Sequence, residues 1–144
     1  MEEALLAFIE SAIEEKTNQL RKIVLHVLGP DEAERLIKLS GLDLIDFQRV
    51  IDNFGVRHAI KKHGNEYQES LRGQIAVEPS DFLLIFTIIV EYDEISMELN
   101  RIGNIIFRYK KEFDAFRLVF AEEVRLGRRE IAFQTLYKQK IRKP

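Results

Sequence analysis

The spacing of apolar residues changes near residue 103, and this change constrains the fold more than any other feature. Before it, apolar side chains recur every three or four positions, as in amphipathic helices. After it they alternate with polar ones, first over Ile105, Phe107 and Tyr109 and then over 116–120 and 131–137. Short turns separate these three segments. We therefore predict an α+β protein, a single domain in which N-terminal helices pack on a small antiparallel sheet of three or four strands.

The helical part of the sequence divides into several expected segments. Residues 3–28 have one apolar face and end at Gly29-Pro30, because proline cannot continue the helical hydrogen-bond ladder. The polar stretch 65–77 lacks a period and is expected to be a loop. Residues 79–91 are apolar on nearly every side, which predicts a buried helix with proline in its first turn. Shorter helices are expected at 31–39, 43–53 and 56–63.

Length and composition bound the class of protein. A chain of 144 residues suits one domain with a core of its own. It contains no cysteine, which excludes disulfides and thiolate metal sites and fits a reducing compartment. No apolar run approaches the roughly 18 residues of a membrane span, and the N-terminus is acidic where a secretory signal would be basic. We expect a soluble, cytoplasmic protein that does not contact a membrane.

The net charge of −2 hides an uneven distribution. Residues 1–55 contain six Lys or Arg and eleven Asp or Glu, whereas residues 56–144 contain sixteen and thirteen. The segment 125–144 is the most basic, because Glu130 is its only acidic residue beside Arg125, Arg128, Arg129, Lys138, Lys140, Arg142 and Lys143. Such a segment can bind phosphate through charge and counterion release, or it can be a solvated tail.

Two of the three histidines lie close together in the sequence. His58 and His63 are five residues apart, so on a helix they point about 140° away from each other and make a poor metal pair. An imidazole with a pKa of about 6.5 suits acid–base catalysis, although two surface histidines on a basic helix would look the same. His26 has apolar neighbours and is interpreted as a packing or surface residue. The cations near the pair are able to hold a phosphodiester: Arg57, Lys61, Lys62 and Arg72.

Several short motifs follow one another in a particular order. The chain reads Arg-His-Ala-Ile-Lys-Lys-His-Gly from Arg57 and Glu-Ser-Leu-Arg-Gly-Gln from Glu69. Glu-Pro-Ser-Asp-Phe then opens the apolar helix, a strand follows, and Thr-Leu-Tyr-Lys begins at Thr135. In this order and spacing, residues 55–140 resemble the phage-associated branch of the barnase–EndoU–colicin–RelE-like nucleases. Residues 1–54 have no counterpart in the resemblance and are expected to be a helical N-terminal region, with 55–144 as the nuclease-like region of the same domain.

The resemblance implies N-terminal helices against a curved antiparallel sheet, and RNA cleavage without a metal or other cofactor. In that reaction a base removes the ribose 2′-hydroxyl proton, the oxygen attacks the adjacent phosphorus, and an acid protonates the leaving 5′-oxygen. The residues that match the family's catalytic motifs are His58, His63, Arg72, Thr135 and Tyr137. Gln74 matches beside Arg72, and further candidates for binding substrate are Tyr109, Lys110 and Lys138. Tyr137 is equally compatible with a core position whose hydroxyl reaches the rim.

Three hypotheses about function follow. The first is an endoribonuclease that acts as a toxin on tRNA or another structured RNA, in a bacterial host or with a phage, with a protein inhibitor or phage head protein as partner. The second is a non-catalytic interaction or immunity module, because the acidic segment 3–28 could pack against a partner. The third is RNA binding without cleavage, supported by the basic tail. Only the first requires His63, Arg72 and Thr135 to line one cleft.

Overall fold

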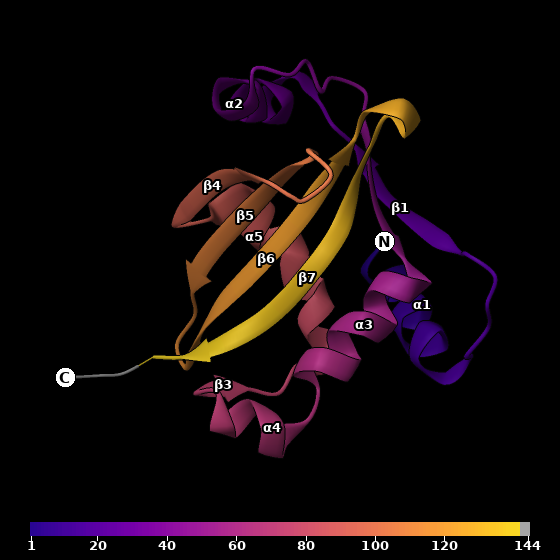
Figure 1. Ribbon diagram of the computed structural model, residues 1–144, viewed down its shortest axis with the longest axis vertical. Coiled ribbons are helices and arrows are strands. Elements are labelled where there is room, and N and C mark those ends of the chain that lie inside the picture. Colours follow the sequence, from indigo (N-terminus) through magenta and orange to yellow (C-terminus); the bar gives the residue numbers. More distant parts are fainter. Residues whose placement is uncertain (142–144) are drawn as a thin grey trace.

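The computed structural model of the protein describes residues 1–141, and its centre is a twisted mixed sheet (Figure 1). The strands run in the order β1-β2-β7-β6-β5-β4, and the short β3 pairs with the far end of β7. Their bounds are β1 Lys22–Val27, β2 Gln48–Asp52, β3 Gln74–Ile75, β4 Glu94–Leu99, β5 Ile105–Glu112, β6 Phe116–Arg125 and β7 Glu130–Lys140. Strands β5 to β7 are joined antiparallel, as the alternating apolar pattern predicts. Strand β4, which the pattern did not predict, also joins β5 antiparallel, whereas β2 runs parallel to β7.

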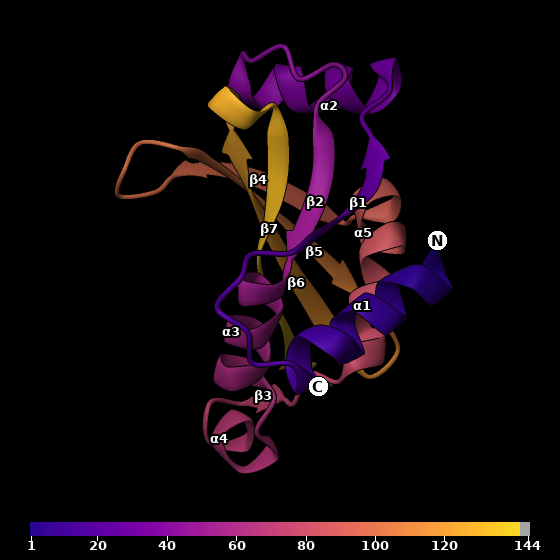
Figure 2. The same cartoon turned by 90° about the vertical axis from the view of Figure 1, so that its right-hand side faces the viewer.

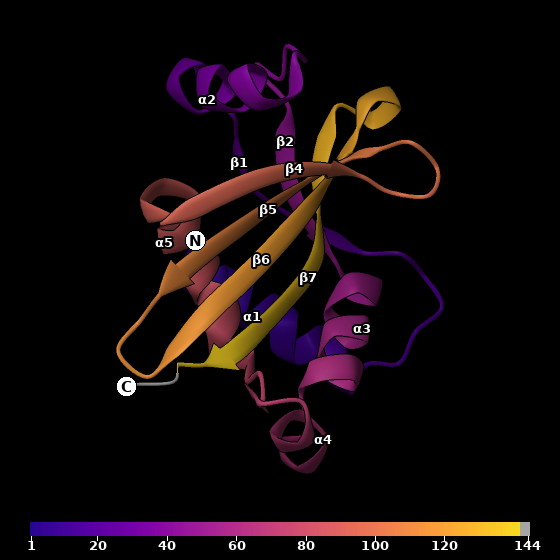
Figure 3. The same cartoon turned by 60° about the vertical axis from the view of Figure 1, so that its left-hand side comes forward.

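Helices cover one face of this sheet and leave the other open. Helix α1 (Glu2–Glu14), the 3-10 helix η1 (Pro79–Leu84) and α5 (Ile85–Glu91) lie behind β5 to β7, as Figures 2 and 3 show from opposite sides. Side chains such as Leu5, Phe82 and Phe120 are fully buried between the two layers. Among the described residues, no helix covers the opposite face of β4 to β7 (Figure 3).

Strand β7 has different neighbours along the edge that faces away from β6. Its beginning pairs with β2, where Gln48 to Val50 lie opposite 130–132, and its end pairs with β3, where Gln74 and Ile75 lie opposite 138–139. Between these two pairings, helix α3 (Asn53–His63) lies beside the strand (Figure 1). The middle of β7 is therefore flanked by a helix on the open side of the fold.

The remaining elements connect these layers. Helix α2 (Pro30–Ser40) ends at Gly41, whose φ of 73° gives the left-handed cap that glycine adopts without strain. Helix α4 (Glu66–Leu71) precedes β3, and the 3-10 turn η2 (Leu126–Arg128) joins β6 to β7. Within residues 1–141, no helix combines the length and the apolar character needed to cross a membrane.

The prediction of one helix over 3–28 is wrong after residue 14, because the second half of that segment is strand β1. The predicted helix at 43–53 is also wrong, since 48–52 form β2, and the expected loop at 65–77 contains α4 and β3. The sheet consequently has seven strands and mixed direction rather than three or four antiparallel ones. The predicted helices at 31–39, 56–63 and 79–91 are confirmed, and of the basic tail Arg142 and Lys143 lie outside the described residues.

Candidate active site

A cavity of about 490 Å³ lies on the open side of the fold, where α3, α4, β3, β5 and β7 meet. It contains every residue that the motifs suggest for catalysis, together with two of the expected substrate-binding residues. Its lining is His58, Lys62, His63, Arg72, Gln74, Arg108, Gln134, Thr135 and Tyr137. The requirement that His63, Arg72 and Thr135 line one cleft is therefore met.

Helix α3 brings the two histidines to β7 because its first turn approaches the strand closely. The Asp52 side chain caps the helix by accepting a hydrogen bond from the Gly55 amide at 2.6 Å. A Cβ atom at Gly55 would lie 3.1 Å from Cδ1 of Phe133, so glycine permits the close approach. His63 is the last residue of the helix, before Gly64. This end position lets its ring reach the same cavity as His58 although the two residues are five positions apart.

His63 is held by a buried carboxylate and an aromatic ring. Its Nδ1 atom lies 3.2 Å from Oε2 of Glu69, and its ring stacks on Tyr137 with 5.1 Å between the ring centroids. Glu69 is completely buried, and its other oxygen accepts a hydrogen bond of 2.6 Å from Nη1 of Arg72. The same Nη1 atom donates to the Lys62 carbonyl at 2.8 Å. These contacts fix the orientation of the imidazole and tie Arg72 to it.

The electrostatic surroundings favour the neutral form of His63. Burial lowers the pKa of His63 below its usual value of 6.5, and the nearby cations Lys62 and Arg72 act in the same direction. The hydrogen bond and charge of Glu69 oppose this shift without reversing it. When the neutral ring donates its Nδ1 proton to Glu69, the Nε2 atom is left unprotonated. His63 can then accept a proton at neutral pH.

The β7 strand contributes neighbouring side chains through a β-bulge. Thr135 lies opposite Ala121 on β6 and Phe133 lies opposite Glu122, so Gln134 is the extra residue. Gln134, Thr135 and Tyr137 all line the cavity. On β5, Arg108 lies opposite Ala121 as well, and the small Ala121 side chain separates the arginine from Thr135. The bulge therefore places the Gln134 amide beside the hydroxyl groups of Thr135 and Tyr137 in the wall of the cavity.

Sequence reasoning missed three members of the site. Glu69 is part of the Glu-Ser-Leu-Arg-Gly-Gln motif, and its spacing from Arg72 is that of an ion pair on one helix turn, which could have indicated it. Arg108 alternates with the apolar Phe107 and Tyr109, so strand parity places it on the open face. No signal in the sequence indicates Gln134, because a bulge is not visible as a pattern.

Five of the expected substrate-binding residues lie elsewhere. On α3, Arg57 and Lys61 border a separate hollow beside α1, and Arg57 donates to the Thr17 carbonyl at 2.8 Å. On the sheet, Tyr109 is buried in the core, Lys110 lines a hollow beside β4, and Lys138 is 7% exposed and pairs with Asp81 at 2.8 Å. Both helix residues are on the side of α3 turned away from the cavity. The remaining two, Lys62 and Gln74, line the cavity as stated.

The third histidine lies outside the cavity, and the described residues include no arrangement that would hold a metal ion. His26 belongs to a buried ionic network around Arg49, away from the cavity, where its Nε2 atom lies 2.9 Å from Nη1 of Arg49. Within residues 1–141, no group of three or more His, Cys, Asp or Glu residues is arranged to hold a metal ion. The side chains that line the cavity carry imidazole, guanidinium, ammonium, amide and hydroxyl groups.

Comparison with known proteins agrees with this geometry. Residues 26–143 match the family described as phage-Barnase-EndoU-ColicinE5/D-RelE like nuclease3. The match begins at the end of β1, well before the residues that carry the motifs, and it takes in α2 and β2. Searches of the curated proteins and of the solved structures returned no match. Because the match extends over most of the chain, the protein belongs to this family of phage-associated nuclease-like domains.

Proposed function

We propose that the protein is a metal-independent endoribonuclease that cleaves RNA by attack of a ribose 2′-hydroxyl on the adjacent phosphorus. The observation that carries the proposal is the pairing of His63 with the buried Glu69 inside a cavity that also contains His58 and cations. A histidine oriented by a carboxylate is a typical general base. The match to a nuclease-like family supports a nucleic-acid substrate.

The proposed reaction uses the two histidines in different roles. The Nε2 atom of His63, free of a proton at neutral pH, removes the proton of the 2′-hydroxyl. The 2′-oxygen forms a bond to phosphorus while the bond from phosphorus to the 5′-oxygen breaks. His58, which lines the same cavity, protonates that leaving oxygen. The products are a 2′,3′-cyclic phosphate and a free 5′-hydroxyl, and the two histidines exchange protonation states.

The remaining lining residues would stabilise the charge that develops on the phosphate oxygens. Lys62 brings positive charge to the cavity, while Arg72 and Arg108 bring guanidinium donors whose charges are paired with Glu69 and Glu98. The Thr135 hydroxyl can donate a hydrogen bond to a non-bridging oxygen. The Oε1 atom of Gln74 is buried and has no hydrogen-bond partner within residues 1–141. A ribose hydroxyl is a suitable donor for this acceptor, because buried polar atoms are normally paired. RNA is preferred over DNA because the nucleophile is the 2′-hydroxyl.

The biological substrate that fits the resemblance is tRNA or another structured RNA, which would make the protein a toxin with a dedicated protein inhibitor. The alternative of a non-catalytic interaction module rested on an unpartnered apolar helix over 3–28. That face is occupied, since Leu5, Ile9 and Ala12 of α1 are buried in the protein's own core. No described contact now favours the interaction module over the enzyme.

The decisive assay mixes purified protein with total RNA in an excess of a metal chelator and resolves the products on a gel. We expect discrete fragments that end in a cyclic phosphate, because the proposed reaction needs no metal ion. Thr135→Val, which removes the hydroxyl and keeps the shape, should abolish the fragments. Intact RNA with a correctly folded protein, or cleavage that disappears with the chelator, would contradict the proposal.

Glu69→Gln is expected to lower kcat by about 10- to 100-fold, as removal of a group that orients a functional histidine commonly does. Glu69 is a positioning residue in the proposal, and the pH profile tests this role. The acidic limb of kcat/KM should lie below pH 6.5 in the wild type, because burial lowers the pKa of the base His63. Since Glu69 raises that pKa, its neutral variant should move the limb to still lower pH.

Glu66→Gln is the matched control, because it makes the same charge change at an exposed position of α4. It should leave both kcat and the acidic limb unchanged. A Glu69→Gln profile whose limb coincides with that of the wild type would show that Glu69 does not act through His63.

A further inference from the structure

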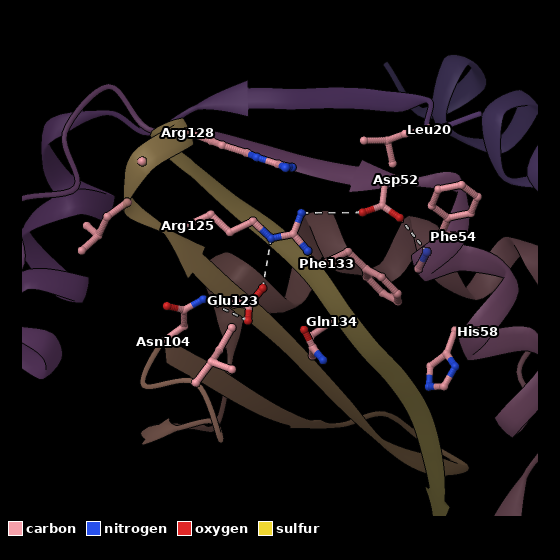
Figure 4. Close-up of a pocket in the computed structure, with 14 residues that line it drawn as sticks. Leu20, Asp52, Phe54, His58, Asn104, Glu123, Arg125, Arg128, Phe133 and Gln134 are labelled. Carbon is pink, nitrogen blue, oxygen red and sulfur yellow. Dashed lines mark hydrogen bonds and ion pairs between the residues drawn. The ribbon is translucent and has the colours of Figure 1, made fainter. Parts of the chain in front are cut away.

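Two further hollows adjoin the active-site cavity. The first has a volume of about 820 Å³ and shares His58 and Gln134 with the cavity (Figure 4). The second has a volume of about 740 Å³ and shares Arg72 and Gln74 with it. Their linings follow the chain around β7 in order, from η2 through 134–137 to 139–141. We call the three hollows together the β7 channel.

The first hollow combines an aromatic ring with a free cation. Phe54, in the first turn of α3, is 41% exposed and borders the hollow. Asp52 and Glu123 are already engaged, the first as the cap of α3 and the second with Arg125 at 3.0 Å (Figure 4). Arg128 is exposed and has no ion-pair partner within residues 1–141. One face of the Phe54 ring carries the Arg57 guanidinium, and the other face is the stacking surface that the hollow offers. Asp52 and Glu123 share Arg125, so Arg128 is the cation of this hollow that is left to bind a phosphate.

The second hollow is polar and lies where β3 pairs with the end of β7. Arg117 donates to Glu112 at 2.8 Å on one side of it, and Arg72 and Gln74 form the side toward the active site. The exposed Lys140 has no ion-pair partner in the part of the chain that the structure describes. Arg128 and Lys140, which have no ion-pair partner within residues 1–141, thus lie at the two ends of the channel, and the histidines lie between them.

We propose that the β7 channel binds one single-stranded segment of RNA, with the scissile phosphate at the histidines and flanking nucleotides in the hollows on either side. The inference rests on the proposed function and names its substrate class. Arg128 and Lys140 contact flanking phosphates, and Phe54 stacks on a base. The 11 residues of β7, from Glu130 to Lys140, span roughly 33 Å at the rise of a strand, enough for several nucleotides.

A single strand fits this channel better than a duplex. Phe54 can stack only on a base that is not enclosed in a helix, and recognition of unpaired bases by aromatic rings is common in RNA-binding proteins. The hollows also lie in a row beside one strand and are bounded by α3 and α4, so they offer separate small sites rather than a broad surface. In a structured RNA, the segments that enter the channel are consequently loops and ends.

The test measures binding of a fluorescent single-stranded oligodeoxynucleotide to the full chain by anisotropy at several salt concentrations. This probe lacks the 2′-hydroxyl and is not cleaved. Arg128→Ala and Lys140→Ala should each weaken binding severalfold and reduce the slope of log K against log salt by about 0.7, the value for one lost phosphate contact on a single strand. Phe54→Ala should weaken binding roughly tenfold, as loss of one stacked base does.

Lys38→Ala is the matched control, because it removes a positive charge from α2, where Lys38 pairs with Glu34. It should change neither affinity nor slope. The channel is refuted if Arg128→Ala and Lys140→Ala behave like Lys38→Ala, or if a duplex of the same sequence binds as tightly as the single strand. Because the probe is not cleaved, weakened binding by these variants would support the channel even if the wild type failed to cut RNA, so the two proposals fail separately.

Discussion

Replacing His63 by alanine is expected to lower the single-turnover rate of RNA cleavage by at least about 100-fold, the usual contribution of a positioned general base. The reason is local: His63 is the buried imidazole that Glu69 orients, and its lowered pKa keeps it ready to accept a proton near neutral pH. Thr135→Ala should also abolish detectable cleavage on the gel, because a donor to the phosphate is lost.

The variant His63→Gln separates catalysis from folding. An amide at this position can still donate to Glu69, so the buried carboxylate keeps a partner while the base is lost. Near-ultraviolet circular dichroism and thermal unfolding should report a native fold for His63→Gln, with cleavage as low as in His63→Ala. Cleavage at the wild-type rate in both His63→Ala and Thr135→Ala would remove these residues from the mechanism and leave the proposed active site without support.

The sequence predicted which motif residues lie together better than which other side chains complete the cavity. The motif residues His58, His63, Arg72, Gln74, Thr135 and Tyr137 all meet in one cavity, although they come from three separate segments. Tyr109 and Lys110 were expected there too, but strand parity turns Tyr109 into the core with Phe107. Glu69 was not expected: its spacing from Arg72 could have indicated an ion pair, but its burial against His63 depends on contacts that the sequence does not show.

The prediction of secondary structure is right where the apolar pattern is long and wrong where it is short. The three strands from 105 to 140 carry a sustained alternation, and the structure confirms them. Residues 22–27 and 48–52 are short apolar runs, which suit a buried strand or a helix turn equally well. Their state is decided by pairing with each other and with β7, a contact distant in sequence. Local spacing therefore could not distinguish the two states.

One buried ionic network fixes β2 to β6 across β7, and local patterns did not reveal it. Arg49 is 1% exposed, and its Nε and Nη2 atoms each donate to Glu122 at 2.8 Å. By strand alternation Glu122 points to the same side of β6 as the buried Phe120, where it also accepts from the Tyr109 hydroxyl at 2.5 Å. Glu122 raises the pKa of Arg49 well above its usual value despite burial, so the guanidinium stays charged. Because α3 begins where β2 ends, this network also anchors the helix that carries the histidines.

Glu122→Ala is expected to lower the free energy of unfolding by about 3–5 kcal/mol, the cost of leaving a buried charge without its partner. Arg49 would keep its contacts with Glu32 and His26, but its Nε and Nη2 donors would face a cavity. Urea unfolding followed by circular dichroism measures the change. Arg21→Ala is the control, because it breaks the exposed pair with Glu15 and should cost no more than about 1 kcal/mol.

The double variant Arg49→Met with Glu122→Leu decides the origin of this cost. If the loss in Glu122→Ala comes from an uncompensated buried charge, removing both charges and keeping the volume should recover most of the stability. Equal destabilisation in the single and double variants would instead indicate that the bidentate pair itself holds β2 in register. In that case the double variant should also lose cleavage activity, because the start of α3, and with it the approach of His58 and His63 to β7, depends on where β2 ends.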